Sequence, residues 1–322
     1  MIRYETLRRR PAAFKSMTGF DPVVFDSLFL AFAGAHEKRC RAFTTTKRTG
    51  QPRERAYGAG HRYSHDLRER LLMALIWLRI YPTYEVLGFL FSLDKTNVRD
   101  NVREVLATLA TLADFAFERP AADRRKARSV GAVMEAFPDV RVVVDAKEQR
   151  CQRPQSTPED DAQKPYYSGK KKCHTLKSEI GVEPEGRIGA LSASVPGGAV
   201  HDLVLLRRTG LIARLDPATE AGMLDRGYQG IRTNYPGYRL YLPFKASKNH
   251  PLTEEQKAYN RHLAQYRIVV EHALAQMNQF QVLAQVYRHA RESHGSVVRV
   301  VGVLINRRID VRPLKSYPAR TA

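Results

Sequence analysis

The sequence predicts an all-helical domain followed by an α/β domain in which helices flank a mixed sheet. Two observations support this division. Apolar residues recur at helical spacing from Ser64 to Leu109, and after residue 129 short β-favouring runs alternate with helical segments. The basic segment 123–128 separates the two patterns. We therefore expect domains at residues 1–128 and 129–322.

The chain is strongly basic. Its 322 residues contain 53 Lys and Arg against 33 Asp and Glu, a formal net charge of +20. Such a charge suits a polyanionic partner, because neutralising phosphates releases condensed counterions. A ribosomal protein or a basic-biased proteome gives the same composition, so composition alone leaves the partner open.

The sequence carries no sign of export or membrane insertion. The three cysteines are odd in number and lack the spacing of a metal site, which is typical of a reducing compartment. No apolar run approaches the length of a membrane span, and no apolar region follows the arginines at 8–10. We expect a soluble, intracellular protein.

The first part of the helical domain holds few apolar anchors. Residues 1–20 read as a basic, irregular arm. Asp21-Pro22 predicts the start of a short amphipathic helix with its body at 25–32. The basic segment 38–62 is either a loop ordered by a nucleic-acid backbone or a solvated linker.

The second part predicts three helices. Ser64 or Asp66 caps the first, which Pro82 ends; Thr83 starts the second, and the third follows a turn at 92–94. The exposed face of the third offers Lys95, Thr96, Asn97, Arg99, Asn101 and Arg103. Two helices joined by a tight turn, the second polar and basic near its start, form the helix-turn-helix that reads a major groove. The alternative is a plain bundle with a solvated face.

Residues 110–138 are expected to continue as helix into the basic segment. The α/β domain follows. We expect strands at 140–145, 167–177, 187–195, 223–225 and 240–244, a helix from His201-Asp202 to Leu215, and a long helix from Thr253 to about Leu283. Thr253 to Gln256 reads as the capping box of the last helix. Three strands, helix, two strands and a long helix is the order of the ribonuclease-H-like fold.

Three acids occupy the places where that fold carries function. Asp145 ends the first strand, Asp225 follows the fourth, and Glu271 lies inside the long helix. Phosphodiester cleavage requires that the charge on the phosphate is offset and that the leaving oxygen is stabilised. Two Mg²⁺ ions held by carboxylates do both. Taken singly, each Asp could be a turn residue and Glu271 could pair with Arg267. We predict that the three acids form one metal-binding triad.

The ordered motifs resemble those of bacterial insertion-sequence transposases of the insertion-sequence-five group, whose DDE domain is shared with Harbinger-type elements. The matching stretches are 144–145 with Glu148 and 152–154, 167–177, 196–202, 224–230, 260–261 and 267–272, and the helices at 67–109 resemble the preceding helix-turn-helix. The resemblance implies that Asp145, Asp225 and Glu271 are the catalytic acids and hold Mg²⁺, for which Mn²⁺ substitutes. It also implies binding to the element's terminal inverted repeats, end cleavage, and joining of 3′-OH ends to target DNA. A dimer or larger synaptic assembly in a bacterial cytoplasm, at the nucleoid, is implied as well.

Two departures from the family pattern stand out. Ala146-Lys147 replaces the usual Gly-Thr after the first Asp, which brings a Lys near the site. Ala264 and Asn278 stand where related elements carry a Tyr and a Lys, so only Arg267 and Glu271 remain of that signature.

Further candidates surround the triad. Lys170, Lys171 and Lys172 beside Tyr166 and Tyr167 suit a phosphate backbone or form a solvated hairpin, and Arg153 and Arg267 are further phosphate contacts. His201 and Asp202 form a second-rank pair: Asp202 either serves the cleft, by orienting a water or pairing with a basic group, or caps the following helix. Together with Lys95, Asn97, Arg99 and Arg103, the basic candidates make up the expected DNA contacts.

Two other functions fit the same residues. A catalytically silent, transposase-derived DNA-binding regulator would retain the fold without cleavage. A ribonuclease-H-like nuclease would cleave without strand transfer. Mg²⁺-dependent cleavage separates the first from a transposase, and joining of a pre-cleaved 3′ end separates the second.

Overall fold

The computed structural model describes residues 1–42, 64–115, 137–155, 161–247 and 250–311. The basic loop expected at 38–62 is wrong at 38–42, where helix α3 continues, and its residues 43–62 and the basic boundary segment 123–128 lie outside the described residues. The chain forms two compact units. The first contains residues 1–114, 278–285 and 296–308, and the second contains residues 115–277, 286–295 and 309–322.

The N-terminal residues of the first unit are helical, so the expected irregular arm is wrong. Helices α1 (Tyr4–Leu7) and α2 (Pro11–Thr18) precede α3 (Pro22–Ala42). Tyr4, Phe14 and Phe25 meet in one ring cluster, with Tyr4 stacked on Phe25 at a centroid distance of 5.1 Å. Burial of these rings fixes both short helices. Helix α3 starts at Pro22 as predicted but runs ten residues past the expected body.

No single helix among the described residues is long and apolar enough to span a membrane. The bent pair α2 and α3, with an angle of 51° between them, passes that test by length and composition only.

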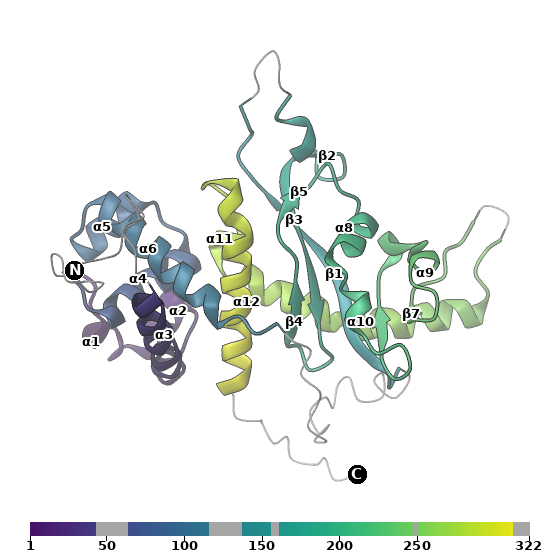
Figure 1. The fold of residues 1–322 in the computed structure, drawn as a ribbon, viewed down its shortest axis with the longest axis horizontal. Coiled ribbons are helices and arrows are strands. Elements are labelled where there is room, and N and C mark those ends of the chain that lie inside the picture. Colours follow the sequence, from purple (N-terminus) through teal and green to yellow (C-terminus); the bar gives the residue numbers. More distant parts are fainter. Residues whose placement is uncertain (43–63, 116–136, 156–160, 248–249, 312–322) are drawn as a thin grey trace, which may run out of the picture. The chain divides into compact units, whose positions relative to one another are not determined.

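The three helices predicted after residue 64 are confirmed as α4 (Leu67–Ile80), α5 (Tyr84–Phe91) and α6 (Lys95–Leu109), followed by η1 (Ala110–Leu112). The side chains of Asp66, Thr83 and Asp94 accept backbone N–H bonds at the three starts. Ser92 takes a left-handed conformation at φ 56°, which turns the chain from α5 into α6 (Figure 1). The expectation that Asn101 is exposed is wrong, because it is buried and accepts a bond from Arg70 at 2.6 Å.

The first unit is completed by segments from the other end of the chain. Helix α11 (Gln281–Ala284) packs on α4, and Arg79 donates to the carbonyl of Gln279 at 2.6 Å. Phe280 is fully buried. Helix α12 (His294–Val311), which the sequence analysis does not predict, contributes residues 296–308.

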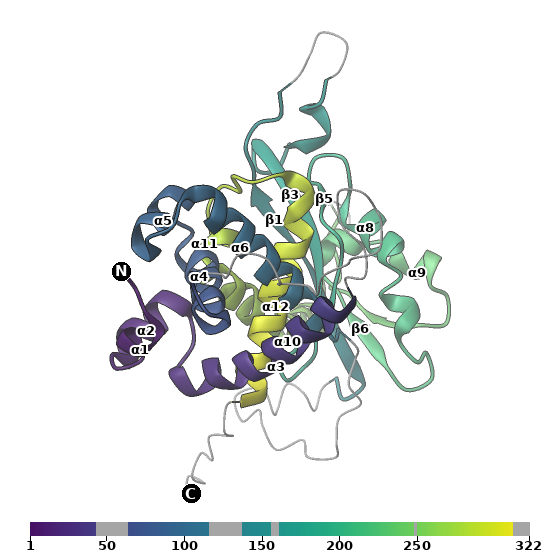
Figure 2. The same ribbon diagram turned by 60° about the vertical axis from the view of Figure 1, so that its left-hand side comes forward.

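The second unit is built on a mixed sheet in the order β2-β3-β1-β6-β7, with β4 and β5 also paired to β3 (Figures 1 and 2). The strands are β1 (Val140–Arg150), β2 (Tyr167–Ser168), β3 (Cys173–Val182), β4 (Ile188–Leu191), β5 (Val195–Pro196), β6 (Ala221–Met223) and β7 (Arg239–Tyr241). Strand β3 is antiparallel to β1 and β4, while β1, β6 and β7 run parallel. This is the mixed α/β sheet expected of a ribonuclease-H-like domain.

Helices and 3-10 turns connect and cover the strands. They are η2 (Lys164–Tyr166), α8 (Asp202–Thr209), η3 (Ile212–Arg214), η4 (Arg226–Tyr228), α9 (Ile231–Asn234), α10 (Glu254–Asn278) and η5 (Arg291–Ser293). Val142 and Val144 of β1 pack into a core with Leu206 of α8, which covers one face of the sheet. Helix α8 and α10 end earlier than expected, at 209 and 278. The capping box is confirmed: Thr253 and Gln256 exchange N–H bonds to side-chain oxygens, both at 3.2 Å.

Strand β1 continues past Asp145 to Arg150, so the prediction that Asp145 ends its strand is wrong. Antiparallel pairing with β3 persists to Arg150, whereas pairing with β6 stops at Val143 and Met223. Asp145 therefore lies where the parallel part of the sheet ends. The strand expected at 187–195 is likewise two short strands, β4 and β5, rather than one.

Candidate active site in the sheet unit

Asp145 lies at the centre of the site. Its Oδ1 accepts the N–H of Ala146 at 2.7 Å, and its Oδ2 lies 3.1 Å from a guanidinium nitrogen of Arg267 on α10. Burial raises the pKa of Asp145, the Ala146 bond and the Arg267 charge lower it, and the charges of Asp225 and Glu271 raise it further. The fold thus brings the second and third predicted acids within electrostatic reach of the first.

Asp225 is positioned by a tight turn after β6. It caps η4, and its Oδ1 accepts the N–H of Gly227 at 2.7 Å. Tyr228 follows and is buried in the core beneath the sheet, which anchors the turn. The position of the Asp225 carboxylate is therefore fixed by the hydrogen bond from the Gly227 N–H and by the burial of Tyr228.

Glu271 comes from the long helix α10. Val270 beside it is fully buried, while Glu271 itself is exposed. Arg267 lies one turn earlier and reaches Asp145, so it pairs with the acid of β1 and not with Glu271. The alternative Arg267–Glu271 pair, weighed from the spacing alone, is absent from the ion pairs of the described residues.

The donor set of these acids fits a divalent cation. Among the ion pairs of the described residues, none involves Asp225 or Glu271, so of the three carboxylates only that of Asp145 is paired, with Arg267. Excess negative charge on hard oxygen ligands suits Mg²⁺ or Mn²⁺. No three His, Cys, Asp or Glu side chains of the described chain already converge at metal-holding distance. Both oxygens of Asp145 are engaged, so a cation there has to share or displace Arg267.

Two roles are considered for Asp202: capping α8, or serving the cleft by orienting a water or pairing with a basic group. His201 caps α8, because its side chain accepts the N–H of Leu203 at 3.4 Å. Asp202 is free of that role, and its Oδ1 lies 2.9 Å from Nζ of Lys177 on β3. In the structure, Asp202 therefore pairs with a basic group, Lys177, and does not cap the helix.

Two residues are not singled out from the sequence: Lys177, which pairs with Asp202, and Gly227, whose N–H binds Asp225. Lys177 has a signal in the sequence, since it is one of the few charged residues of β3, as is Glu179, and its side chain is only 12% exposed. Gly227 has none before the fold is known. Lys147, the departure from the family pattern, is half-buried; burial and the charge of Lys171 lower its pKa to about 8.

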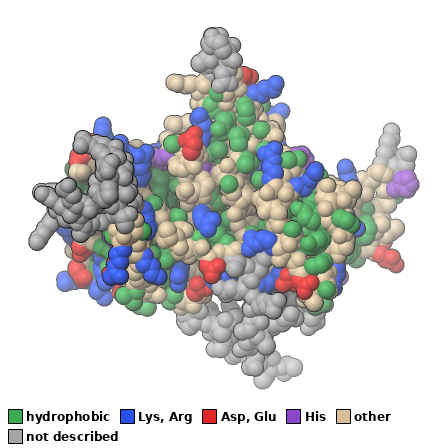
Figure 3. Space-filling view, in the orientation of Figure 1, with side chains coloured by type: hydrophobic (Ala, Val, Ile, Leu, Met, Phe, Trp, Pro, Cys, Tyr) green, Lys and Arg blue, Asp and Glu red, His purple; other side chains and the backbone are tan. Residues whose placement is uncertain are grey.

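The basic candidates occupy several surfaces. Lys170, Lys171 and Lys172 form the exposed turn between β2 and β3, where Lys172 has φ 53°. Arg153 donates to Gln163 at 2.5 Å. In the helical unit, Lys95, Asn97 and Arg103 are exposed on α6, and Arg99 is partly exposed and binds Asp100 at 2.9 Å. On the face drawn in Figure 3, Lys and Arg side chains are scattered and not gathered in one stripe.

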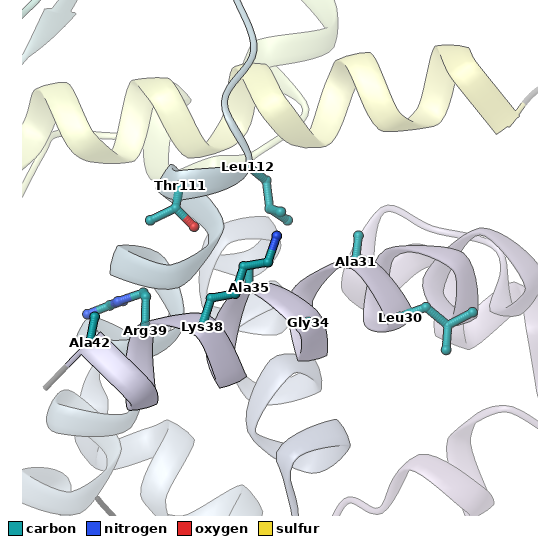
Figure 4. A pocket seen from close by; sticks show the side chains of 9 residues that line it. All are labelled: Leu30, Ala31, Gly34, Ala35, Lys38, Arg39, Ala42, Thr111 and Leu112. Carbon is teal, nitrogen blue, oxygen red and sulfur yellow. The ribbon is translucent and has the colours of Figure 1, made fainter.

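A separate groove of about 590 Å³ lies in the helical unit, between α3 and residues 111–112 (Figure 4). Its walls are mostly apolar, and Lys38 and Arg39 supply its charges. Among its described lining residues there is no carboxylate. These residues therefore do not offer the acidic ligands that phosphodiester chemistry on a divalent cation requires.

Comparison with known proteins agrees with this geometry. Residues 144–306, half of the chain, match the family described as DDE superfamily endonuclease. The matched range contains Asp145, Asp225 and Glu271. A relative from Microchaete diplosiphon, "Probable transposase for insertion sequence element IS702", is 27% identical over 248 residues, which cover 77% of this chain and 82% of that protein. The chain belongs to the DDE superfamily of endonucleases.

Proposed function

We propose that the protein is an insertion-sequence transposase that binds the terminal inverted repeats of its element, cleaves at the ends and joins the 3′-OH ends to target DNA. The observation that carries this proposal is the placement of Asp145, Asp225 and Glu271. They come from three separate elements of the sheet unit, namely strand β1, the turn before η4 and helix α10, and the charges of the latter two acids act on Asp145. The resemblance to a probable transposase supports the same reaction.

Asp145, Asp225 and Glu271 would hold divalent cations, with Mg²⁺ as the natural ion and Mn²⁺ as a substitute. When bound, such ions offset charge on the reacting phosphate and make water a better nucleophile. Burial keeps Asp145 partly out of water, which strengthens its electrostatic interactions. Arg267 directs a guanidinium at the same carboxylate and is placed to contact a phosphate brought there.

The helical unit would recognise the element ends. The α5–turn–α6 segment presents Lys95, Asn97, Arg99 and Arg103 from the start of α6, which suits a helix entering the major groove. In the sheet unit, the exposed turn at 170–172 and Arg153 would contact the phosphate backbone. Because two ends are joined to one target, the working form is a dimer or larger synaptic assembly.

The proposal is tested with the full-length protein and DNA carrying the sequences that flank its gene. With Mg²⁺ we expect cleavage at the matched inverted repeats, and joined product when a pre-cleaved 3′ end is supplied. Binding without cleavage would identify a DNA-binding regulator instead. Cleavage without joining would identify a nuclease.

Arg99→Ala and Arg103→Ala are each expected to weaken binding to end DNA while the fold is retained. A side chain that reads a base edge contributes ~1–3 kcal/mol, so the loss should be larger for end DNA than for unrelated DNA. Fluorescence anisotropy on both DNAs measures the difference.

Lys15→Ala serves as the control, since Lys15 is exposed on α2 and pairs with Asp21 at 3.1 Å. It removes one positive charge from the same unit without touching α6. Equal affinities of both α6 variants and the parent protein for end DNA would move recognition away from this helix.

A further inference from the structure

Asp202 and Lys177 form a fixed ion pair beside the predicted metal site. The Lys177 ammonium lies 2.9 Å from Asp202 Oδ1 and donates to the carbonyl of Val200, also at 2.9 Å. Asp202 is the first residue of α8 and Val200 lies two residues before it, whereas Lys177 belongs to β3. With two acceptors, a lysine that is 12% exposed at its side chain ties the first turn of α8 to the sheet.

The other oxygen of Asp202 faces the turn that carries Asp225. A Cβ placed on Gly227 would lie 3.0 Å from Asp225 Oδ1 and 3.2 Å from Asp202 Oδ2. Two carboxylates therefore flank the position that a side chain on Gly227 would take, and there is little space between them for one. The N–H of Gly227 is also the donor that fixes Asp225 Oδ1, at 2.7 Å. Asp202 thus lies beside Gly227, the residue whose N–H sets the orientation of Asp225.

We propose that Asp202 and Lys177 are positioning residues, which hold Asp225 in the orientation that a divalent cation requires. This inference rests on the proposed function, in which Asp225 is a metal ligand. Lys177 offsets the charge of Asp202, so that Asp202 can pack against Gly227 without repelling Asp225. Loss of the Asp202 charge leaves the largely buried Lys177 ammonium without its ion-pair partner, so that the first residue of α8 is no longer held beside Gly227. Removal of Lys177 leaves two like charges on either side of Gly227.

The test measures binding of Mn²⁺ to the full-length protein in the absence of DNA, from the electron paramagnetic resonance signal of free Mn²⁺. Outer partners of metal ligands typically contribute about 10- to 100-fold in metal affinity. We therefore expect Asp202→Asn and Lys177→Met each to weaken Mn²⁺ binding about 10-fold or more. The double variant should lose less than the product of the two single losses, because it removes both unpaired charges.

Matched controls separate this effect from a general one. Lys257→Met breaks an exposed pair with Glu254 in the same unit, 2.8 Å long, and should leave Mn²⁺ affinity unchanged. Lys177→Arg keeps the charge and should restore most of the affinity. Thermal unfolding of each variant shows whether the fold is retained, so that a variant that fails to fold is set aside in favour of the conservative one.

Asp225→Asn distinguishes failure of the metal site from failure of the positioning role of Asp202 and Lys177. If Asp225→Asn lowers Mn²⁺ affinity while folded Asp202→Asn and Lys177→Met do not, the positioning role is overturned and the metal site stands. If Asp225→Asn itself leaves Mn²⁺ affinity unchanged, the metal site of the proposed function falls instead. Losses in the double variant equal to the product of the single losses would also overturn the coupling.

Discussion

Asp225→Asn is expected to lower cleavage of the element's end DNA by on the order of 10³-fold, while affinity for that DNA stays within a few fold. The substitution keeps the size of the side chain and removes one negative charge. It also keeps an oxygen that can accept the Gly227 N–H, so the η4 turn should survive. Binding could tighten slightly, because a negative charge facing the phosphate is lost.

The measurement pairs affinity for labelled end DNA with Mg²⁺-dependent cleavage of the same DNA. Asp161→Asn is a suitable control, since Asp161 is an exposed acid of the same unit. Near-normal cleavage by Asp225→Asn would exclude Asp225 from the catalytic centre. Asp202 would then be the next residue to substitute.

Gly88→Ala is expected to destabilise the helical unit by ~3 kcal/mol, at the upper end of the cost of overpacking. A Cβ on Gly88 would lie 2.4 Å from the carbonyl oxygen of Leu93, a backbone atom that cannot rotate away. The N–H of Leu93 in turn donates to the carbonyl of Gly88 at 2.9 Å. The substitution forces α5 and α6 apart at their turn, and binding of end DNA should weaken with it.

Gly34→Ala is the matched control, because Gly34 also lies inside a helix but has nothing within 4 Å of its Cβ position. Replacing an unhindered helical glycine by alanine stabilises by ~0.5–1 kcal/mol. Chemical unfolding of both variants, followed by hydrogen exchange of α6, measures the contrast. An equal effect of the two substitutions would contradict the close approach at Leu93.

Local signals account for the parts of the fold that the sequence predicts well. Helix caps bind backbone groups only two or three residues away, so a short sequence pattern is enough to predict them. This holds for Asp66, Thr83 and the capping box at Thr253. The prediction of Asp145, Asp225 and Glu271 as a triad likewise rests on their order along the chain, which matches the order of strands and helices. None of these inferences requires knowledge of distant contacts.

The missed parts depend on distant contacts. Tyr4 and Phe14 order the first residues only when Phe25 covers them, and their spacing alone gives no helical period. Helix α12 is rich in valine, which favours strands in isolation and is helical here through burial of Val298 and Val301. The pair of Lys177 with Asp202 joins β3 to α8 and cannot be read from either segment.

The route of the chain between the two units has a consequence for synthesis. The N-terminal helices leave the ribosome first, yet residues 278–285 and 296–308 belong to the same unit and include the buried Phe280 and Leu304. Domains usually fold as they emerge, at about 5–20 residues per second. Here the first unit cannot complete its core until nearly the whole chain has been made. A gene copy truncated after residue 277 would therefore yield helices with an exposed apolar surface, prone to aggregation and degradation, and not a free DNA-binding fragment that competes for the element's ends.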